Sequence, residues 1–349
     1  MTETSTFKRG LPEGIAAIVG LCIGAGLWYT HTMCTTSTAP ASAKVAASPA
    51  INGRAQISAA PVADPIHAPL YAAAHASRRI VVAGEHGVIV LSDDAGQTFR
   101  QARMVPTQAL LTSLSFVDDK QGWAAGHDGV VIHTADGGET WVLQHEELDG
   151  DKPLFSVFFR DAQHGFAVGL FGTDIQTADG GKNWAPLTVD TGEENDHHLY
   201  AIFGDATAAL YVAGETGLIY RSTDGGASWN TIKTSNPGSF WAGLQLSDGS
   251  LLAAGQRGHL FGSHDQGASW SEIPSGTEQS LTGIVQAADG AILVTGLAGT
   301  TLSSTDGGKT FSAQTRNDRV PLNGALSQAA AAPVLFGDKG IVGRPKERE

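Results

Sequence analysis

Cysteine, charged residues and aromatic residues are all scarce in this chain of 349 residues. Its two cysteines, Cys22 and Cys34, both precede residue 35, so no disulfide can form within the rest of the chain. Charged residues make up 16%, against about 25% in an average soluble domain, which excludes a highly charged disordered chain and a coiled coil. With 22 basic and 35 acidic residues, the net charge of −13 disfavours a nucleic-acid partner, because phosphates would be repelled.

Glycine is abundant instead. The chain has 44 glycines, about 13% of its residues, against a usual level near 7%. They do not fall at every third position, which excludes a collagen-like chain. Much glycine with little charge is typical of short strands joined by tight turns, and it predicts an all-β fold.

One long apolar run lies near the N-terminus, from Ile15 to Met33. It has no Asp, Glu, Lys or Arg, two basic residues precede it, and its length just suffices to cross a bilayer as a helix. We therefore expect a cytoplasmic N-terminus over residues 1–12 and a transmembrane anchor, or uncleaved signal, over residues 13–33. The alternative is a cleaved signal peptide with Ala41-Ser42-Ala43 as its cleavage site.

The stretch over residues 34–62 consists mainly of Ala, Ser, Thr and Pro without periodicity, which is typical of a linker. The folded domain is expected over residues 63–345. Because the anchor precedes it, we expect this domain on the periplasmic or extracytoplasmic side of the inner (cytoplasmic) membrane, held by a single transmembrane pass.

Within that domain a repeat of about 42 residues recurs. Six segments align without gaps, among them AGHDGVVIHTADGGETW from Ala125 and AGETGLIYRSTDGGASW from Ala213, and a seventh stops early. The first glycines are separated by steps of 41 to 45 residues. These glycines are Gly84, Gly126, Gly169, Gly214, Gly255, Gly296 and Gly337.

Each repeat has the pattern of four short strands. In the fourth repeat these strands are expected over Leu199–Phe203, Leu210–Ala213, Leu218–Ser222 and Trp229–Lys233, with a Gly-x-x-Gly turn between the second and the third. Four short antiparallel strands recurring at this spacing are the signature of a β-propeller blade. Seven first glycines predict a seven-bladed propeller of four-stranded blades. A solenoid is the alternative, but it would not require a split repeat.

The seventh repeat ends before its last strand. A closed ring needs that strand from elsewhere, since an open sheet edge would remain otherwise. We expect a segment within Ala46–Val62 to supply it, so that an N-terminal strand completes the last blade.

The turn before each fourth strand has the pattern S/T-x-D-x-G-x-T/S/N-W/F. Its Asp can accept backbone N–H bonds within the tight turn, and the following aromatic residue can pack between blades. One Asp per blade places these carboxylates too far apart for a shared metal or catalytic site, so their role is structural. They are Asp94, Asp136, Asp179, Asp224, Asp265 and Asp306, and the aromatics include Trp141, Trp184, Trp229 and Trp270.

G-x-x-G-x-I followed by D-G-G-x-T-W resembles the pattern of the photosystem II stability and assembly factor family, within the wider bacterial neuraminidase repeat, or Asp-box, propellers. The resemblance covers residues 65–343 and is strongest in TADGGETW, TADGGKNW and STDGGASW. The resemblance implies a protein that aids the assembly of a membrane complex. In photosynthetic members of the family, that complex is photosystem II. Photosynthetic members are expected to present a basic face, so this acidic chain departs from the family.

The Gly-x-x-Gly turns and the links between blades should share one face of the ring, here called the Gly-x-x-Gly face. The Asp-box turns should lie on the other, the Asp-box face. The residues inside the Gly-x-x-Gly turns would then rim one mouth of the central channel. Together with the acidic links, they give a predicted partner-binding surface of Glu85, His86, His127, Asp128, Leu170, Phe171, Glu215, Arg257, Lys339, Glu146, Glu147, Glu193 and Glu194.

Charge is uneven around this face. The links over residues 145–153 and 190–198 are acidic, whereas Arg316, Arg319 and Lys339 lie across the ring. A polar docking face for a partner protein is the hypothesis, and ordinary solvated loop charge is the alternative. No metal or other cofactor is predicted, because the adjacent His197 and His198 cannot easily share one ion and no third ligand has a fixed spacing.

Catalysis is not expected. Asp-box propellers include sialidases, which need an arginine cluster and a Tyr–Glu pair, but the Arg-Ile-Pro motif expected near the first blade is absent. Tyr71, Tyr200 and Tyr211 occupy predicted core positions of strands, and Tyr200 with Glu215 would be the pair to test for turnover.

We therefore expect a non-catalytic, membrane-anchored propeller that binds a membrane or exported protein and aids its assembly or stability, and a small-molecule substrate is disfavoured. The alternatives are an accessory subunit of an envelope transporter complex and a sialidase-like glycoside hydrolase.

Overall fold

The computed structural model describes residues 57–148, 152–192, 196–205, 209–328 and 331–342. All of them belong to the second of two compact units into which the chain divides, Ile51–Glu349. The predicted membrane segment over residues 13–33 and the linker up to residue 56 lie outside these ranges and stay predictions. Across the described ranges, no helix has the length and apolar character needed to cross a membrane.

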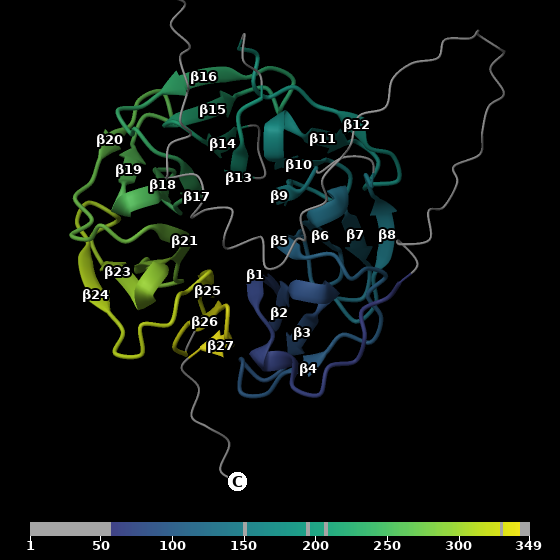
Figure 1. Cartoon of the computed structure of the whole chain (residues 1–349). Coiled ribbons are helices and arrows are strands. Elements are labelled where there is room, and N and C mark those ends of the chain that lie inside the picture. Colours follow the sequence, from purple (N-terminus) through teal and green to yellow (C-terminus); the bar gives the residue numbers. More distant parts are fainter. Residues whose placement is uncertain (1–56, 149–151, 193–195, 206–208, 329–330, 343–349) are drawn as a thin grey trace, which may run out of the picture. The chain divides into compact units, whose positions relative to one another are not determined.

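Seven antiparallel sheets follow one another around a central axis, which confirms the predicted seven-bladed propeller (Figure 1). Within each sheet the strands follow chain order outward from the axis. The innermost strands are β1 (Leu70–Ala76), β5 (Leu111–Phe116), β9 (Leu154–Phe159), β13 (Leu199–Gly204), β17 (Phe240–Gln245), β21 (Leu281–Gln286) and β25 (Gly324–Leu326).

The remaining strands complete the blades. The second strands are β2 (Arg79–Gly84), β6 (Gly122–Gly126), β10 (Gly165–Gly169), β14 (Leu210–Gly214), β18 (Leu251–Gly255), β22 (Ile292–Gly296) and β26 (Val334–Gly337). The third strands are β3 (Ile89–Ser92), β7 (Val131–Thr134), β11 (Asp174–Thr177), β15 (Leu218–Ser222), β19 (Leu260–Ser263), β23 (Thr300–Ser304) and β27 (Gly340–Val342). The fourth strands are β4 (Arg100–Gln101), β8 (Val142–His145), β12 (Ala185–Pro186), β16 (Asn230–Lys233), β20 (Ser271–Glu272) and β24 (Ser312–Thr315).

Short 3₁₀ helices occur where the chain turns. One, η1 (Pro65–His67), precedes the first strand. The others form Gly-x-x-Gly turns and are η2 (Glu85–Gly87), η3 (His127–Gly129), η4 (Leu170–Gly172), η5 (Gln256–Gly258) and η6 (Leu297–Gly299).

The second strands explain the composition of the sequence. Every residue of β6 (GWAAG) and of β18 (LLAAG) is buried. Neighbouring blades cover both faces of each sheet, so the usual alternation of polar and apolar residues is lost. Small residues at these positions let neighbouring sheets pack closely, which accounts for much Ala and Gly and little charge.

Trp141, the aromatic residue after the Asp-box turn of the second blade, packs between two blades. Trp141 is completely buried in a cluster that joins Val81 and Leu91 of the first blade to Ile132 of the second. Its indole Nε1 donates to the carbonyl oxygen of Gly138 at 2.9 Å, and its ring meets Phe116 edge-on at 6.2 Å. The residue therefore holds its own turn and the interface between two blades together.

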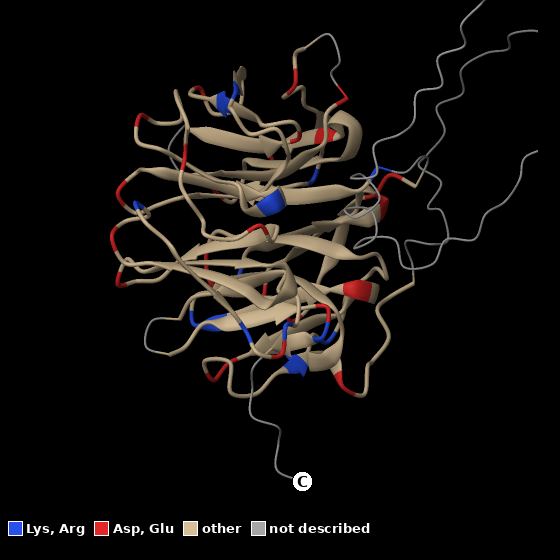
Figure 2. Cartoon of the chain, turned by 60° about the vertical axis from the view of Figure 1, so that its left-hand side comes forward, with Lys and Arg blue, Asp and Glu red and all other residues tan. Residues whose placement is uncertain are grey.

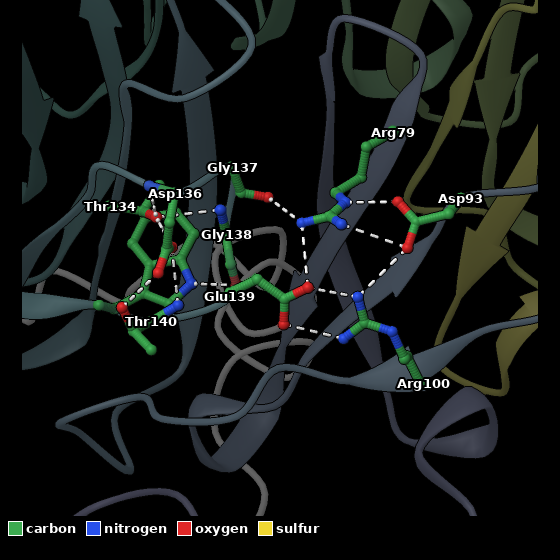
Figure 3. Close-up of polar contacts among 10 residues, drawn as sticks. Arg79, Asp93, Arg100, Thr134, Asp136, Gly137, Gly138, Glu139 and Thr140 are labelled. Atoms are coloured by element: carbon green, nitrogen blue, oxygen red, sulfur yellow. Dashed lines mark hydrogen bonds and ion pairs between the residues drawn. The ribbon is translucent and has the colours of Figure 1, made fainter.

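The Asp-box carboxylates accept hydrogen bonds within their own turns. Asp136 Oδ1 accepts the backbone N–H of Thr140 at 2.9 Å, and Oδ2 accepts its hydroxyl at 2.6 Å (Figure 3). Thr134 donates to Asp136 and accepts the backbone N–H of Gly138. In the fourth blade the equivalent bonds, first that from the Ser228 hydroxyl, lower the pKa of Asp224 to about 2. These carboxylates are therefore fully ionised acceptors at neutral pH.

The ring closes where the seventh sheet meets the first blade. Leu70 and Val82 of the first blade share one buried cluster with Leu326 and Phe336 of the seventh sheet. The amide of Asn323, which precedes β25, donates to the carbonyl oxygen of Leu70 at 2.9 Å. Packing of side chains thus joins sheets whose residues are about 250 positions apart in the chain.

The predicted closing strand is not found in the part of its segment that the structure describes. Residues 57–62 form no strand and lie against the first blade, where Ala59 N donates to the carbonyl oxygen of Val105 at 2.9 Å. Pro61 and Pro65 lack N–H groups, which disfavours a ladder here. Instead η1 packs against β27, with Ile66 and Ala68 in the closing cluster. The rest of the predicted segment, residues 46–56, lies outside the described ranges.

Replacing Trp141 by Ala should lower the free energy of unfolding by about 3–5 kcal/mol, because the change opens a cavity between two blades. Urea denaturation measures this loss. The matched control is Val142→Ala, whose side chain is 54% exposed and should change stability by less than about 0.5 kcal/mol. Equal effects of the two substitutions would contradict the proposed packing role.

Candidate functional site

The Gly-x-x-Gly turns lie against the links that enter the innermost strands. His127 N donates to the carbonyl oxygen of Leu110 at 2.9 Å, and Leu170 N donates to that of Pro153 at 3.1 Å. Equivalent bonds recur in the other complete blades. Turns and links therefore share one face, as the sequence predicted.

Backbone geometry explains the two glycines of the motif. A Cβ at Gly126 would collide with the carbonyl oxygen of Leu110, so the first glycine permits the close approach of the link. The second glycine has a positive φ, +61° at Gly129. The residue before it is also left-handed, with φ +58° at Asp128 and +50° at Phe171. Left-handed geometry is costly for a bulky side chain such as phenylalanine.

The predicted partner-binding residues fall on this face wherever they are described. Glu85 and His86 lie in η2, His127 and Asp128 in η3, Leu170 and Phe171 in η4, and Arg257 in η5. Glu215 follows β14, Lys339 lies between β26 and β27, and Glu146 and Glu147 follow β8. Glu193 and Glu194 lie outside the described residues.

Acidic residues gather in the loops at the ends of the strands, while the strands themselves carry few charges (Figure 2). On the Gly-x-x-Gly face, Asp128, Glu146 and Glu147 come together, and Glu147 N donates to the carbonyl oxygen of Asp128 at 2.8 Å. Burial raises the pKa of Glu146, opposed by His145, and the carboxylate of Asp128 adds to the rise. Like charges are therefore close together here.

The opposite side of the same face carries basic residues. Arg257 is exposed in η5, and Lys339 is exposed at the last turn. Arg316 N donates to the carbonyl oxygen of Gly299 at 2.9 Å, which sets the link before the seventh sheet beside η6. The guanidinium of Arg316 pairs with Asp318 at 2.6 Å. Basic residues on this side thus stand among acids such as Asp318, and the asymmetry of charge stays a prediction.

The innermost strands carry a feature that the sequence does not predict. In six blades the register shifts at the second residue of this strand, so that this residue forms a β-bulge. Bulges re-aim side chains and are common near functional sites. The bulge residues are Tyr71, Thr112, Phe155, Tyr200, Trp241 and Thr282.

Two of these positions correct the sequence analysis. Tyr71 and Tyr200 were expected in the core but are only half-buried at bulges, whereas Tyr211 is 1% exposed and confirms its prediction. The sequence did carry a signal for these bulges: four repeats have an aromatic residue at the second position of the innermost strand. Whether such a residue is buried depends on the register of strand pairing, which composition does not reveal.

Four rings in the third and fourth blades form a continuous row, here called the aromatic row. Phe171 and His198 meet edge-on at 4.6 Å, and His198 meets Tyr200 edge-on at 6.3 Å. Tyr200 stacks on Phe155 at 5.6 Å with an interplanar angle of 9°. The row leads from an exposed turn to the two innermost strands β9 and β13.

A buried polar cluster lies at the same junction of blades. Asp174 occupies a core position of β11, where other blades carry apolar residues such as Ile89 and Val131. Its carboxyl is buried like those side chains, at 6% exposed. Its Oδ2 accepts Val189 N at 3.4 Å, and its Oδ1 has no hydrogen-bond partner among the described residues. Burial raises the pKa of Asp174 to about 7, and nearby Asp190 adds to the rise.

Each carboxylate oxygen of Asp190 has its own hydrogen-bond partner. Its Oδ2 lies 2.6 Å from Nδ1 of His197, and its Oδ1 accepts the backbone N–H of Gly192 at 3.0 Å. Burial also raises the pKa of Tyr220, and Asp190 adds to that rise. Across the part of the chain that the structure describes, no group of three or more His, Cys, Asp and Glu side chains is arranged to hold a metal ion.

On the Asp-box face, four charged side chains bridge the first two blades (Figure 3). Arg79 Nε pairs with Asp93 Oδ1 at 2.6 Å, and Arg79 Nη1 pairs with Glu139 Oε1 at 3.2 Å. Arg100 contacts the same two carboxylates. Because each charge has a partner and the pairs are partly exposed, this network fastens the blades modestly and offers little free charge to a ligand.

Comparison with known proteins matches part of the chain to a described family. The family described as "Photosynthesis system II assembly factor YCF48" matches residues 142–293 of this chain, from the fourth strand of the second blade to the second strand of the sixth. The photosystem II assembly protein Ycf48 of Thermosynechococcus vestitus is 38% identical over 132 residues, which cover 38% of each chain. The photosystem II assembly lipoprotein Ycf48 of Prochlorococcus marinus is 41% identical over 119 residues, or 33% of this chain and 34% of that protein. This chain thus spans little more than a third of the length of these relatives.

Solved structures share the fold. A structure titled "YCF48 bound to D1 peptide" has a TM-score of 0.64 and 20% identity, and covers 84% of this chain and 97% of its own. Virginiamycin B lyase from Staphylococcus aureus has a TM-score of 0.63 and 13% identity, and covers 79% of this chain and 94% of its own. The matches confirm the resemblance predicted from the motifs: the chain is a β-propeller like the photosystem II assembly factors.

Asp174 should make the stability of the fold depend on pH. Its pKa is higher in the folded chain, about 7, than in the unfolded chain, about 3.8, so stability is greatest when it is protonated and falls as the pH rises through 7. Between mildly acidic and mildly alkaline buffer, near pH 5 and pH 8, the wild type should lose about 3 kcal/mol more stability than Asp174→Ile.

Urea unfolding at the two pH values measures this difference. Asp174→Asn should behave like the Ile variant, because it also removes the ionisable group. The control Asp196→Asn, at an exposed acid in the neighbouring loop, should keep the wild-type dependence. An unchanged pH dependence in both Asp174 variants would contradict the assignment.

Proposed function

We propose that this chain is a non-catalytic propeller that binds a membrane or exported protein through its Gly-x-x-Gly face and aids the assembly or stability of that partner. The match over residues 142–293 to an assembly factor family carries this proposal. That stretch supplies the acidic links and the turn with Phe171, which at 60% exposed is the most exposed large apolar side chain of the described residues. Aromatic residues such as phenylalanine are enriched in protein–protein interfaces.

The fold alone does not decide between binding and catalysis, because a lyase shares it. Binding is favoured by what the site contains. Asp174, whose pKa is raised to about 7 by burial, is 6% exposed and therefore poorly accessible to a substrate. The Gly-x-x-Gly face presents charged loops on a rigid ring, which lowers the ordering cost of binding a large partner.

The relatives suggest the kind of partner. Two of them are photosystem II assembly proteins, and a structure of the same fold has a D1 peptide bound. A relative is also described as a lipoprotein, which supports membrane attachment for this chain as well. We propose that residues 13–33 hold the propeller at the outer surface of the inner membrane, where tethering raises its effective concentration near membrane partners.

Site-specific crosslinking in native membranes tests the proposal. A photoreactive p-benzoylphenylalanine at His86 or Arg257, both exposed turn positions of the Gly-x-x-Gly face, should give a crosslink to one membrane or exported protein, identified by mass spectrometry. The same group at the exposed Val142 position should not give that crosslink. Loss of the gene should reduce the level of the identified partner.

Crosslinks of equal yield from all three positions, or an unchanged partner level in the deletion strain, would contradict the proposal. For the enzyme alternative, turnover of a fluorogenic sialoside that is lost in Tyr200→Phe would favour hydrolysis instead.

A further inference from the structure

The aromatic row has no structural reason to include Phe171. The equivalent turn position carries His86, Asp128, Thr216, Arg257 and Ala298 in other blades, so the turn does not require an aromatic residue. The phenyl ring is 60% exposed and its backbone adopts a left-handed conformation with φ +50°. Both exposure and strain oppose stability, and such outliers are more common where function needs them.

The surroundings of the row are acidic. Glu215 N donates to the carbonyl oxygen of His198 at 3.1 Å, so this acid adjoins the centre of the row. On the other side η3, with Asp128, packs against β9, the strand of Phe155. We call the acidic side chains beside the row the acidic arc, which consists of Asp128, Glu146, Glu147, Asp196 and Glu215.

Basic side chains of the protein neutralise the carboxylates of the acidic arc only in part. Lys152 approaches Glu147 at 3.7 Å, and Lys233 bonds the carbonyl oxygen of Thr216. Five carboxylates against these two ammonium groups leave the arc negative. An anionic lipid surface or a nucleic acid would therefore be repelled.

Negative charge beside the exposed ring of Phe171 and the half-buried ring of Tyr200 suits one class of ligand. Lys and Arg side chains bind the faces of Tyr and Phe by cation–π interaction and pair with carboxylates at the same time. A straight, extended peptide segment can present such a side chain to a row of rings.

We propose that the aromatic row and the acidic arc bind an extended basic segment of the partner protein, with a Lys or Arg side chain placed over the rings of Phe171 and Tyr200. This assignment rests on the proposed docking function and adds the chemistry of the partner. The basic side of the same face, with Arg257 and Lys339, would orient the partner by repelling the same segment.

Peptide binding to the full chain in detergent micelles tests the assignment. The probes are fluorescent dodecapeptides of repeated Lys-Gly-Ser, of Glu-Gly-Ser and of norleucine-Gly-Ser, followed by fluorescence anisotropy at low and high salt. The lysine peptide should bind, more weakly at high salt, while the norleucine peptide should bind about tenfold more weakly and the glutamate peptide not at all. Equal binding of all three would overturn the proposal.

Two pairs of variants locate the site. Phe171→Asn introduces a residue that tolerates left-handed geometry, and it should weaken binding of the lysine peptide about threefold. The control Ala298→Asn, at the same turn position of the sixth blade, should not weaken it. The double variant Glu146→Gln, Glu147→Gln should weaken it about fivefold. Its control is Glu278→Gln, an exposed acid on the link between the fifth and sixth blades.

Loss of binding in a control as large as in its test variant would overturn the site. Sedimentation of the chain without peptide addresses the other occupant, a second copy of this chain. A dimer that Phe171→Asn abolishes would also overturn the proposal, because the arc would then be a contact between copies.

The photocrosslink at His86 separates this proposal from the proposed function. If the wild type captures its partner and the Phe171 and Glu146/Glu147 variants capture it equally well, the docking function stands and the assigned site fails. If the wild type captures no partner, the docking function fails, whatever the peptides do.

Discussion

Packing between neighbouring sheets is the constraint on which this structure depends. Each blade has two apolar faces and can bury them only against the blades before and after it, so no blade is stable alone. Trp141 and its counterparts fill these interfaces, and the Asp-box turns hold them in place with ionised carboxylates. The same requirement demands that the last sheet meet the first, which Leu70, Phe336 and their neighbours accomplish without any hydrogen-bonded ladder between the two sheets in the described residues.

In a ring built in this way, the residues that maintain the fold differ from those that are free to serve a function. The positions that repeat in every blade serve the ring: the first glycine of each Gly-x-x-Gly turn admits the backbone of a link, and the Asp-box closes a turn. The positions that vary are the second residue of the turn and the links, and they lie together on one face. Proteins with this fold can therefore differ in activity, as the assembly factors and the lyase do.

The third blade departs most from the repeat. Asp174 replaces an apolar core residue, and Phe171 places a bulky ring at a left-handed turn position that the other blades share but fill with other residues. The two departures cost stability by different routes, a buried carboxyl and a bulky side chain on strained backbone. Sites where a sequence breaks its own local rules are where function is expected, and these two lie in the same blade.

The sequence by itself determined the number of blades, the order of their strands and the structural role of the Asp-box, because these follow from the period of the repeat and from local turn chemistry. It also placed the Gly-x-x-Gly turns and the links between blades on one face, since strand order fixes which turns lie together. It did not determine the aromatic row or the half-buried state of Tyr71 and Tyr200, because these depend on a one-residue shift of register within the innermost strands. Nor did it reveal how the ring closes, where the described N-terminal residues give a 3₁₀ helix against β27. Contacts between residues from opposite ends of the chain decide that closure, and only the tertiary structure brings them together.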